Sequence, residues 1–319
     1  MHDPAVDPEL LPGLDAIPAF ELNDETLALF RSGMTAMARR PEDCMRPNVL
    51  VEEHWAPARA GAPPVRFLLY RPRSVAGPLP LLLFLHGGGY VLGTPELNHA
   101  GCMRTADELG CLVASVDYRL APETRAPGQL EDCYTVLALL HRNAAAWSID
   151  VERIALGGES AGGGLAAALA LMVRDRGEYR LVFLQLIAPM LDDRTCTRTD
   201  LSPNLGRHVW NVQLNCFGWQ ALLGSEPGAD GVSSYAAAAR AEDLVGLPPT
   251  YLSVGALDLF VEENLHFGRR LMAAGVALEL HVFPRAYHGF EVSVMADVAV
   301  RAEVERRHAL ARAFAGKGG

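Results

Sequence analysis

The stretch Gly158-Glu159-Ser160-Ala161-Gly162 decides the fold of this chain, because it lies between the apolar run 154–156 and an alanine-rich segment with helical character. A G-x-S-x-G turn that joins a strand to a helix is too tight for side chains at its flanking positions. It also exposes the serine hydroxyl beside the helix N-terminus. The pattern is short and also arises by chance. Together with the motifs below, it predicts that Ser160 is a nucleophile.

A second glycine-rich stretch, His86-Gly87-Gly88-Gly89-Tyr90, directly follows the apolar run 81–85. Three consecutive glycines contribute no apolar area and cost backbone entropy, so packing does not explain them. Bare peptide N–H groups at this place are suited to the oxyanion of a tetrahedral intermediate in acyl transfer. A flexible loop is the alternative interpretation. We interpret His86, at the end of the strand, as a structural histidine that braces the glycines.

A serine nucleophile needs a general base, and the chain has ten histidines. His288 differs from the others because it follows a predicted strand at 278–283 in a loop, where open α/β sheets carry their chemistry. Asp258 likewise follows the predicted strand 250–255. The chain order Ser160, Asp258, His288 is that of an α/β-hydrolase. Five other acids between the serine and the histidine do not directly follow a strand: Asp192, Asp193, Asp200, Asp230 and Asp243.

The chain resembles the bacterial branch of the hormone-sensitive lipase family of α/β-hydrolase carboxylesterases. The matching motifs lie at 86–89, 117–123, 157–163, 258 and 288–290, in the order and spacing of that family. Two positions depart from the pattern. Many relatives carry Asp where Glu159 stands, and many carry Pro where Leu259 stands. Neither residue belongs to the reacting groups, so these departures concern the subfamily and the shape of the pocket.

The resemblance implies a role for each of the central residues. Ser160 is the implied nucleophile, His288 the general base and Asp258 the acid that orients the histidine. The implied oxyanion hole consists of the peptide N–H groups of Gly88, Gly89 and Ala161.

The apolar runs predict eight strands, near 49–55, 65–71, 81–86, 111–117, 153–158, 181–187, 250–255 and 278–283. Helical patterns separate the later strands, which indicates a mainly parallel sheet, and the closely spaced first strands favour an antiparallel start. We therefore expect the α/β class and the α/β-hydrolase fold, with a mainly parallel eight-stranded sheet flanked by helices and a helical cap.

Two segments fall outside this alternation of strands and helices. The first contains a predicted helix from Asn23 to Arg40, stopped by Pro41. Its apolar stripe consists of Leu27, Phe30, Met34 and Met37. The second is the connection from 188 to 249, which is longer than a crossover needs. We interpret both as one cap over the catalytic loops. For the stripe, packing against the core is favoured over substrate contact, and a role at a membrane surface ranks below both.

The predicted organisation is an N-terminal part of the cap at 1–48, a first core part at 49–188, a cap insertion at 189–245 and a second core part at 246–319. The candidate walls of a substrate pocket are Tyr90, Trp210, Trp219, Leu259 and Phe260. Charged residues next to a nucleophile more often brace loops than react, and we assign this structural role to Glu159. We expect Arg119 and Glu123 to form such a brace with each other, since the arginine fork matches a carboxylate.

Composition and charge exclude several classes of function. The chain has 319 residues and a formal net charge of −10, which argues against nucleic acids and anionic membranes as partners. The N-terminus lacks the features of a signal peptide, and no apolar run approaches a membrane span. The six cysteines form no C-x-x-C pair and the histidines show no ligand spacing, so we expect no metal and no cofactor. We expect reduced thiols and a cytoplasmic location.

These observations predict a serine carboxylesterase that hydrolyses short- to medium-chain esters through an acyl-enzyme. Amide, lactone or carbamate hydrolysis and acyl transfer to an alcohol use the same side chains and stay open as alternatives. A receptor-like binding protein without catalysis is a further alternative, against which the filled triad positions weigh. The last strand, near 278–283, offers a sheet edge through which a homodimer can form.

Overall fold

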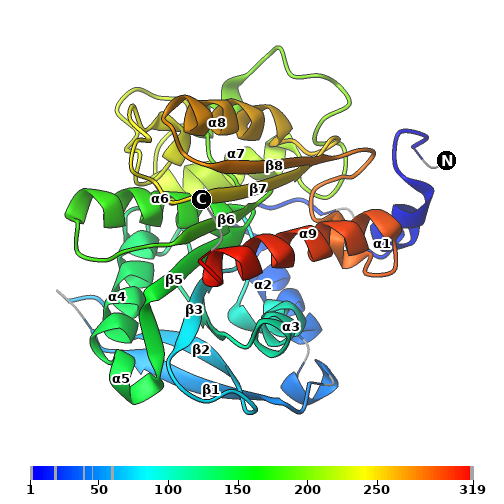
Figure 1. The fold of residues 1–319 in the computed structure, drawn as a ribbon. Helices are drawn as coiled ribbons and strands as arrows, with labels where there is room; N and C mark the ends of the chain where they lie inside the picture. Colours follow the sequence, from blue (N-terminus) through cyan, green and yellow to red (C-terminus); the bar gives the residue numbers. More distant parts are fainter. Residues whose placement is uncertain (1–2, 18–19, 39, 45, 59–60, 317–319) are drawn as a thin grey trace.

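An eight-stranded sheet runs through the computed structural model, which describes residues 3–17, 20–38, 40–44, 46–58 and 61–316 (Figure 1). The strand order is β1-β2-β4-β3-β5-β6-β7-β8. The strands are β1 (Val49–Ala56), β2 (Val65–Pro72), β3 (Leu79–Leu85), β4 (Leu112–Val116), β5 (Ile149–Glu159), β6 (Phe183–Ile187), β7 (Thr250–Gly255) and β8 (Leu278–Phe283). β2 is antiparallel to β1 and to β4, and the remaining pairs are parallel. The predicted fold class and all eight predicted strands are confirmed.

The central strands are apolar on both faces because helices cover both faces of the sheet. Every residue of β3 and β4 is buried, as expected for parallel strands inside an α/β protein. Leu83 and Leu85 of β3 belong to the large core cluster on one face. Leu82 and Phe84 belong to a smaller cluster on the other face.

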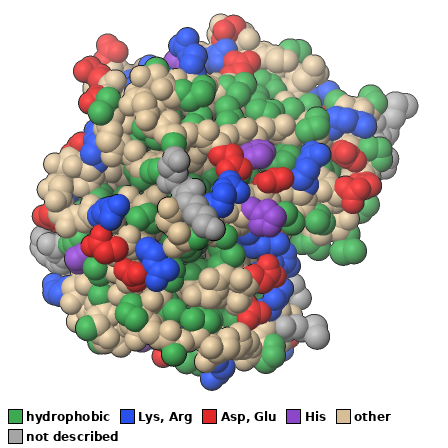
Figure 2. Space-filling view, viewed as in Figure 1, with side chains coloured by type: hydrophobic (Ala, Val, Ile, Leu, Met, Phe, Trp, Pro, Cys, Tyr) green, Lys and Arg blue, Asp and Glu red, His purple; other side chains and the backbone are tan. Residues whose placement is uncertain are grey.

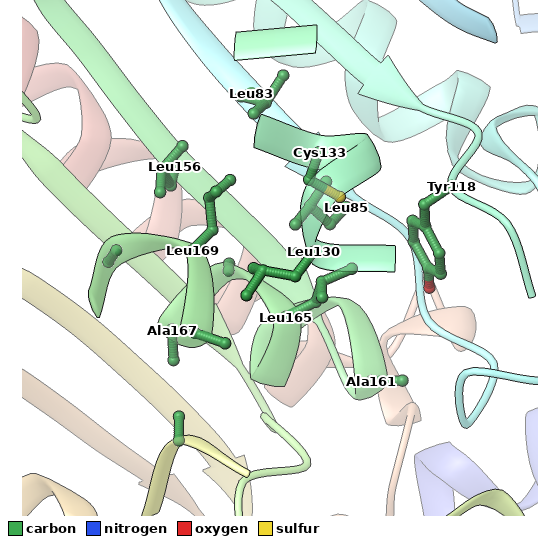
Figure 3. Packing of buried hydrophobic residues seen from close by; sticks show 14 of the residues in the cluster. Leu83, Leu85, Tyr118, Leu130, Cys133, Leu156, Ala161, Leu165, Ala167 and Leu169 are labelled. Carbon is green, nitrogen blue, oxygen red and sulfur yellow. The ribbon is translucent and has the colours of Figure 1, made fainter. Parts of the chain in front are cut away.

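Five long helices form the two outer layers. α3 (His99–Leu109) and α9 (Asp297–Phe314) contact each other and pack on one face. α4 (Gly128–Arg142), α6 (Ala161–Arg176) and α8 (Val261–Ala273) pack on the other. Figure 3 shows Leu165 and Leu169 of α6 near Leu156 of β5 and Leu130 of α4. This packing anchors α6, whose first residue directly follows Ser160.

The remaining helical elements are shorter or lie outside the two layers. They are η1 (Pro8–Leu10), α1 (Leu11–Asp15), α2 (Leu27–Met37), η2 (Pro41–Cys44), η3 (Pro95–Asn98), α5 (Ala144–Trp147), η4 (Asp193–Thr197), α7 (Val212–Leu223), η5 (Ala238–Arg240) and η6 (Phe290–Val292). η4, α7 and η5 all lie in the long connection between β6 and β7. Among the described helices, none combines the length and the apolar character that crossing a membrane requires.

The predicted helix from Asn23 to Arg40 is wrong in its bounds, since α2 is shorter at both ends. The Asn23 side chain accepts hydrogen bonds from the N–H groups of Glu25 and Thr26, at 3.0 and 2.9 Å, and so caps a single turn that ends where α2 begins. At the other end, Ala38 has an extended backbone. Arg39 lies outside the described residues. Of the predicted stripe, Leu27 is buried, while Phe30 and Met34 are half-buried against the core.

β8 lies at the end of the strand order and pairs only with β7. Pairing of two copies along this edge stays a prediction, as does the division of the chain into core and cap segments.

Candidate active site

The turn at Ser160 leaves no space for side chains on its neighbours. A Cβ atom at Gly162 would overlap the carbonyl oxygens of Leu85 and His86, and one at Gly158 would overlap the carbonyl oxygen of Gly162. Ser160 itself has φ 53° and ψ −121°, a conformation that costs energy for any residue with a side chain. Both glycines of the motif are therefore required by the close approach of β3, β5 and α6.

Three side chains from the ends of three strands meet at this turn. His288 Nε2 lies 2.9 Å from Ser160 Oγ, and His288 Nδ1 lies 2.7 Å from Asp258 Oδ2. The second carboxylate oxygen of Asp258 accepts a hydrogen bond of 2.9 Å from the N–H of Phe260, which fixes the carboxylate in place. All three side chains are buried. The structure thus brings together the three residues that the sequence selected.

Two opposed effects set the pKa of His288. Burial disfavours the imidazolium, while the charge of Asp258 and the hydrogen bond to it favour the imidazolium. The balance raises the pKa of His288 above its ordinary value of 6.5, and the charges of Glu291 and Glu159 act in the same direction. With Nδ1 donating to Asp258, the neutral imidazole presents the lone pair of Nε2 to the serine hydroxyl.

The predicted oxyanion loop follows β3 and has an irregular backbone. Gly88 and Gly89 have φ values of 121° and 60°, which favour glycine. The carbonyl of Gly88 accepts hydrogen bonds from the N–H groups of Val91 and Leu92, which closes the loop into a turn. Among the described residues, the N–H groups of Gly88, Gly89 and Ala161 donate to no backbone carbonyl. Ala161 is the first residue of α6, so its N–H has no partner within the helix.

The His86 side chain is held between the glycine loop and Tyr118, which follows the end of β4. Its Nδ1 lies 2.8 Å from the carbonyl oxygen of Gly87, and its ring stacks on Tyr118 with 4.2 Å between centroids. The Tyr118 hydroxyl donates to the carbonyl of His86 at 2.7 Å. Burial lowers the pKa of His86, so the ring is neutral at physiological pH. These contacts suit a residue that braces the loop.

Two of the candidate pocket residues lie directly against the triad. The Phe260 ring meets the His288 ring edge to face, with 5.2 Å between centroids. The centroid of the Trp210 ring lies 6.4 Å from that of the His288 ring. The same indole lies so close to Gly89 that a Cβ atom at Gly89 would overlap the indole. Trp210 therefore covers the space between the glycine loop and the histidine.

The other three candidate pocket residues are fully buried. Tyr90 and Trp219 contact each other with 5.4 Å between ring centroids, and the Tyr90 hydroxyl donates to the carbonyl of Met190. Leu259 packs against Gly206 in the connection between β6 and β7. These residues connect that segment to the core, and their part in a pocket stays a prediction.

The predicted brace between Arg119 and Glu123 is wrong, because each residue has another partner. Arg119 Nη2 and Nε pair with the two carboxylate oxygens of Asp132 at 2.7 and 2.8 Å. The Asp132 carboxylate is buried on α4 and needs a cation close by. Glu123 instead forms a two-pronged ion pair with Arg31 of α2, at 2.6 and 2.9 Å.

Arg31 is a residue of the site region that the sequence analysis missed. Besides Glu123, it donates to the carbonyl of Val91 at 2.8 Å and to the carbonyl of Ala121 at 2.7 Å. Val91 directly follows the glycine loop and Tyr90, so this guanidinium joins α2 to the oxyanion loop. The signal was present in the sequence, since Arg31 stands between Leu27 and Met34 at helical spacing, where an exposed arginine is out of place.

The Glu159 side chain lies on the face of the sheet that α3 and α9 cover. One of its carboxylate oxygens accepts a hydrogen bond of 2.8 Å from the side chain of Asn98. Glu159 also lines a small cavity together with Gln185 and Arg306. These contacts connect the turn to η3 and α9, and the structural role of Glu159 stays a prediction.

One group of potential metal ligands occurs among the described residues. Glu279 and His281 of β8 and Glu305 of α9 bring their ligand atoms within 4.8 Å of one another. Figure 2 shows histidines and charges of both signs gathered over β8 and α9. His281 lies 3.0 Å from Glu279, which also pairs with Arg312, so Glu279 already has two partners. The group takes no part in the contacts of the triad.

The family of the chain follows from comparison with known proteins. The model of the α/β-hydrolase fold family matches residues 82–292. The chain belongs to this family, in the branch related to hormone-sensitive lipase.

Several of its relatives are esterases. The esterase LipI of Mycobacterium tuberculosis is 32% identical over 293 residues, which cover 90% of this chain and 88% of that protein. An ethyl acetate hydrolase of Pseudomonas putida is 30% identical and covers 71% of both chains. Among solved structures, bacterial heroin esterase is 39% identical, with a TM-score of 0.91 and 98% of each chain covered.

The contacts of Arg31 predict an effect on turnover. Replacing Arg31 with alanine removes the hydrogen bond to Val91, so we expect kcat for a short ester to fall on the order of tenfold through displacement of the loop. KM should change less. Arg31→Lys should not restore the rate, because one ammonium cannot replace the planar fork. The measurement is steady-state kinetics, with circular dichroism to verify the fold.

Arg40→Ala is the matched control, because it removes an exposed ion pair with Asp43 in the same N-terminal segment. It should leave kcat and KM unchanged. A folded Arg31→Ala variant with the wild-type kcat would contradict the role of this contact.

Proposed function

We propose that the chain is a serine carboxylesterase in which Ser160, His288 and Asp258 form the catalytic triad. The observation that carries this proposal is the continuous pair of hydrogen bonds from Ser160 Oγ to His288 and from His288 to Asp258, at 2.9 and 2.7 Å. Membership of the α/β-hydrolase family and the esterase names of the relatives support it.

The proposed reaction has two steps. His288 takes the proton of Ser160 as the hydroxyl attacks the ester carbonyl, a base catalysis that contributes roughly 10²–10⁴-fold. Asp258 orients the imidazole and stabilises the imidazolium without taking the proton. His288 then protonates the leaving alcohol and activates a water, which hydrolyses the acyl-enzyme.

The proposed oxyanion hole consists of the N–H groups of Gly88, Gly89 and Ala161. These donors belong to two different segments, the loop after β3 and the start of α6. Each is worth about 3 kcal/mol in the transition state when it is aimed at the developing charge.

We also propose that residues 1–48 and 189–245 form a cap over this site. Both segments contact the glycine loop. Arg31 of α2 binds the carbonyl of Val91, and Gly218 of α7 approaches so closely that a Cβ atom would lie 2.7 Å from the carbonyl oxygen of Gly89. With Trp210 beside Gly89, such a cap limits the length of the acyl chain. We therefore propose short- to medium-chain esters as substrates, in line with the name of the relative that hydrolyses ethyl acetate.

Labelling by a fluorophosphonate tests the nucleophile. We expect one adduct per chain at Ser160, because among the described residues this is the one serine hydroxyl hydrogen-bonded to a histidine that in turn contacts a carboxylate. Ser160→Ala should abolish the adduct, and His288→Ala should slow labelling strongly. Ser115→Ala is the control, since it removes a buried hydroxyl elsewhere in the core. Intact mass and peptide mapping read the result, and a folded protein that never labels would favour a non-catalytic binding role.

The raised pKa of His288 predicts the acid limb of the pH profile. The base must be neutral to accept the serine proton, so kcat/KM should fall as the pH drops through a pKa above 6.5. Asp258→Asn removes the charge that favours the imidazolium and leaves the effect of burial. The limb should then move to lower pH, while kcat falls on the order of 10³–10⁴-fold.

A fluorogenic ester measured from pH 5 to 9 follows both changes, and the exposed Asp230→Asn is the control. An acid limb that stays in place in Asp258→Asn would show that Asp258 does not act on the base.

A series of 4-nitrophenyl esters from acetate to dodecanoate tests the substrate class. We expect kcat/KM to be highest for the short acyl chains and at least about tenfold lower for dodecanoate, because Trp210 closes the space beside Gly89. Trp210→Ala should shift the maximum to longer chains. Best rates on emulsified long-chain esters would contradict the proposed cap. An amide or lactone cleaved orders of magnitude faster than any ester would replace the proposed substrate class.

A further inference from the structure

Two cysteines face each other in the connection between β6 and β7. Cys196 lies in η4 and Cys216 in α7. The Cys216 thiol is directed at the carbonyl of Cys196, with 3.7 Å between sulfur and oxygen, so the two cysteines are neighbours across these elements. Both side chains are partly exposed, whereas Cys102, Cys111 and Cys133 are buried. A small oxidant can therefore reach this pair.

The contact also makes one of the two thiols the better nucleophile. The neighbouring Cys196 side chain lowers the pKa of Cys216, and burial opposes this effect only in part. A thiolate attacks disulfides and a neutral thiol does not, so Cys216 is the sulfur that reacts first.

A chain of side-chain contacts leads from this pair to the proposed active site. The buried Asn215 donates to Cys196 Sγ at 3.3 Å, and its Oδ1 lies 3.4 Å from Trp210 Nε1. Trp210 in turn packs on Gly89 of the oxyanion loop. On the same helix, Gly218 contacts the carbonyl of Gly89. A change at Cys196 and Cys216 thus acts on both elements that lie against the loop.

We infer that Cys196 and Cys216 are a modification site, at which a small-molecule disulfide such as glutathione disulfide converts the two thiols reversibly into an intramolecular disulfide. The Cys216 thiolate attacks one sulfur of the small disulfide, and the first glutathione leaves as a thiolate. Cys196 then loses its proton and attacks Cys216, and the second glutathione leaves. Two protein thiols are oxidised, one disulfide is reduced to two thiols, and both protons end on glutathione.

The new bond ties η4 to α7 and takes Cys196 Sγ away from Asn215. Asn215 then no longer holds Trp210 in the position in which the indole covers Gly89. The disulfide form should hydrolyse a short ester with a kcat/KM lower on the order of fivefold, and a thiol reductant should restore the rate.

The test exposes the full chain to glutathione disulfide and reads its intact mass under non-reducing conditions. We expect a loss of about 2 Da, and peptide mapping should give one cross-link between residues 196 and 216. Cys196→Ser should stop at a mixed disulfide on Cys216, with a gain of about 305 Da, while Cys216→Ser should react slowly or not at all. Cys44→Ser is the control and should form the same cross-link as the wild type.

The mass readout does not depend on the proposed esterase activity, so the two proposals fail separately. A wild-type chain that carries glutathione on both cysteines, or that stays unmodified, would overturn the modification site. A complete cross-link with an unchanged rate on a short ester would overturn its coupling to the active site. Cross-linking in a chain that hydrolyses no ester would contradict the proposed function alone.

Discussion

The structure depends on one steric constraint, the contact between the start of α6 and the end of β3. There the backbone at Gly162 lies against the carbonyl groups of Leu85 and His86, with no space for even a methyl group. This contact forces Ser160 into a backbone conformation with positive φ and directs its hydroxyl to the edge of the sheet where the strands end. It also brings the start of α6 close to the loop that follows β3, where Gly87 lies against the side chain of Ser160. The geometry of the nucleophile and that of the proposed oxyanion donors therefore have the same cause.

Burial of the surrounding side chains strengthens this arrangement. Asp258, His288 and Ser160 are almost inaccessible to water, so the interactions between them are stronger than they would be at the surface. The same burial disfavours the imidazolium that forms during proton transfer, and the carboxylate of Asp258 offsets this effect. The large apolar core around α4, α6 and the central strands supplies the rigidity with which these groups are held.

The strands, the glycine turns and the three candidate catalytic residues were predictable from the sequence, because each depends on a local sequence pattern. Continuous apolar runs marked β3 and β4, and glycines at 87–89, 158 and 162 marked the places where backbones approach. The positions of Asp258 and His288 after predicted strands were sufficient to select them from many acids and histidines. Ionic partners were less predictable, since a charge gives no information on which distant residue it meets. Glu123 pairs with a residue 92 positions away, and Arg119 turns to a buried aspartate. The start of α2 was misplaced because the turn that Asn23 caps does not continue as regular helix, which begins only at Leu27.

The glycine at 218 restricts how substrate range can diverge among chains of this kind. Any larger residue there would push α7 away from the carbonyl of Gly89. Substitutions at position 218 are therefore not expected to widen the proposed substrate pocket. Drift in selectivity should accumulate at position 210 instead, where an indole can be exchanged for smaller rings or aliphatic groups while the main chain stays in place. Libraries built to diversify the enzyme are best concentrated on that side chain, with position 218 left constant.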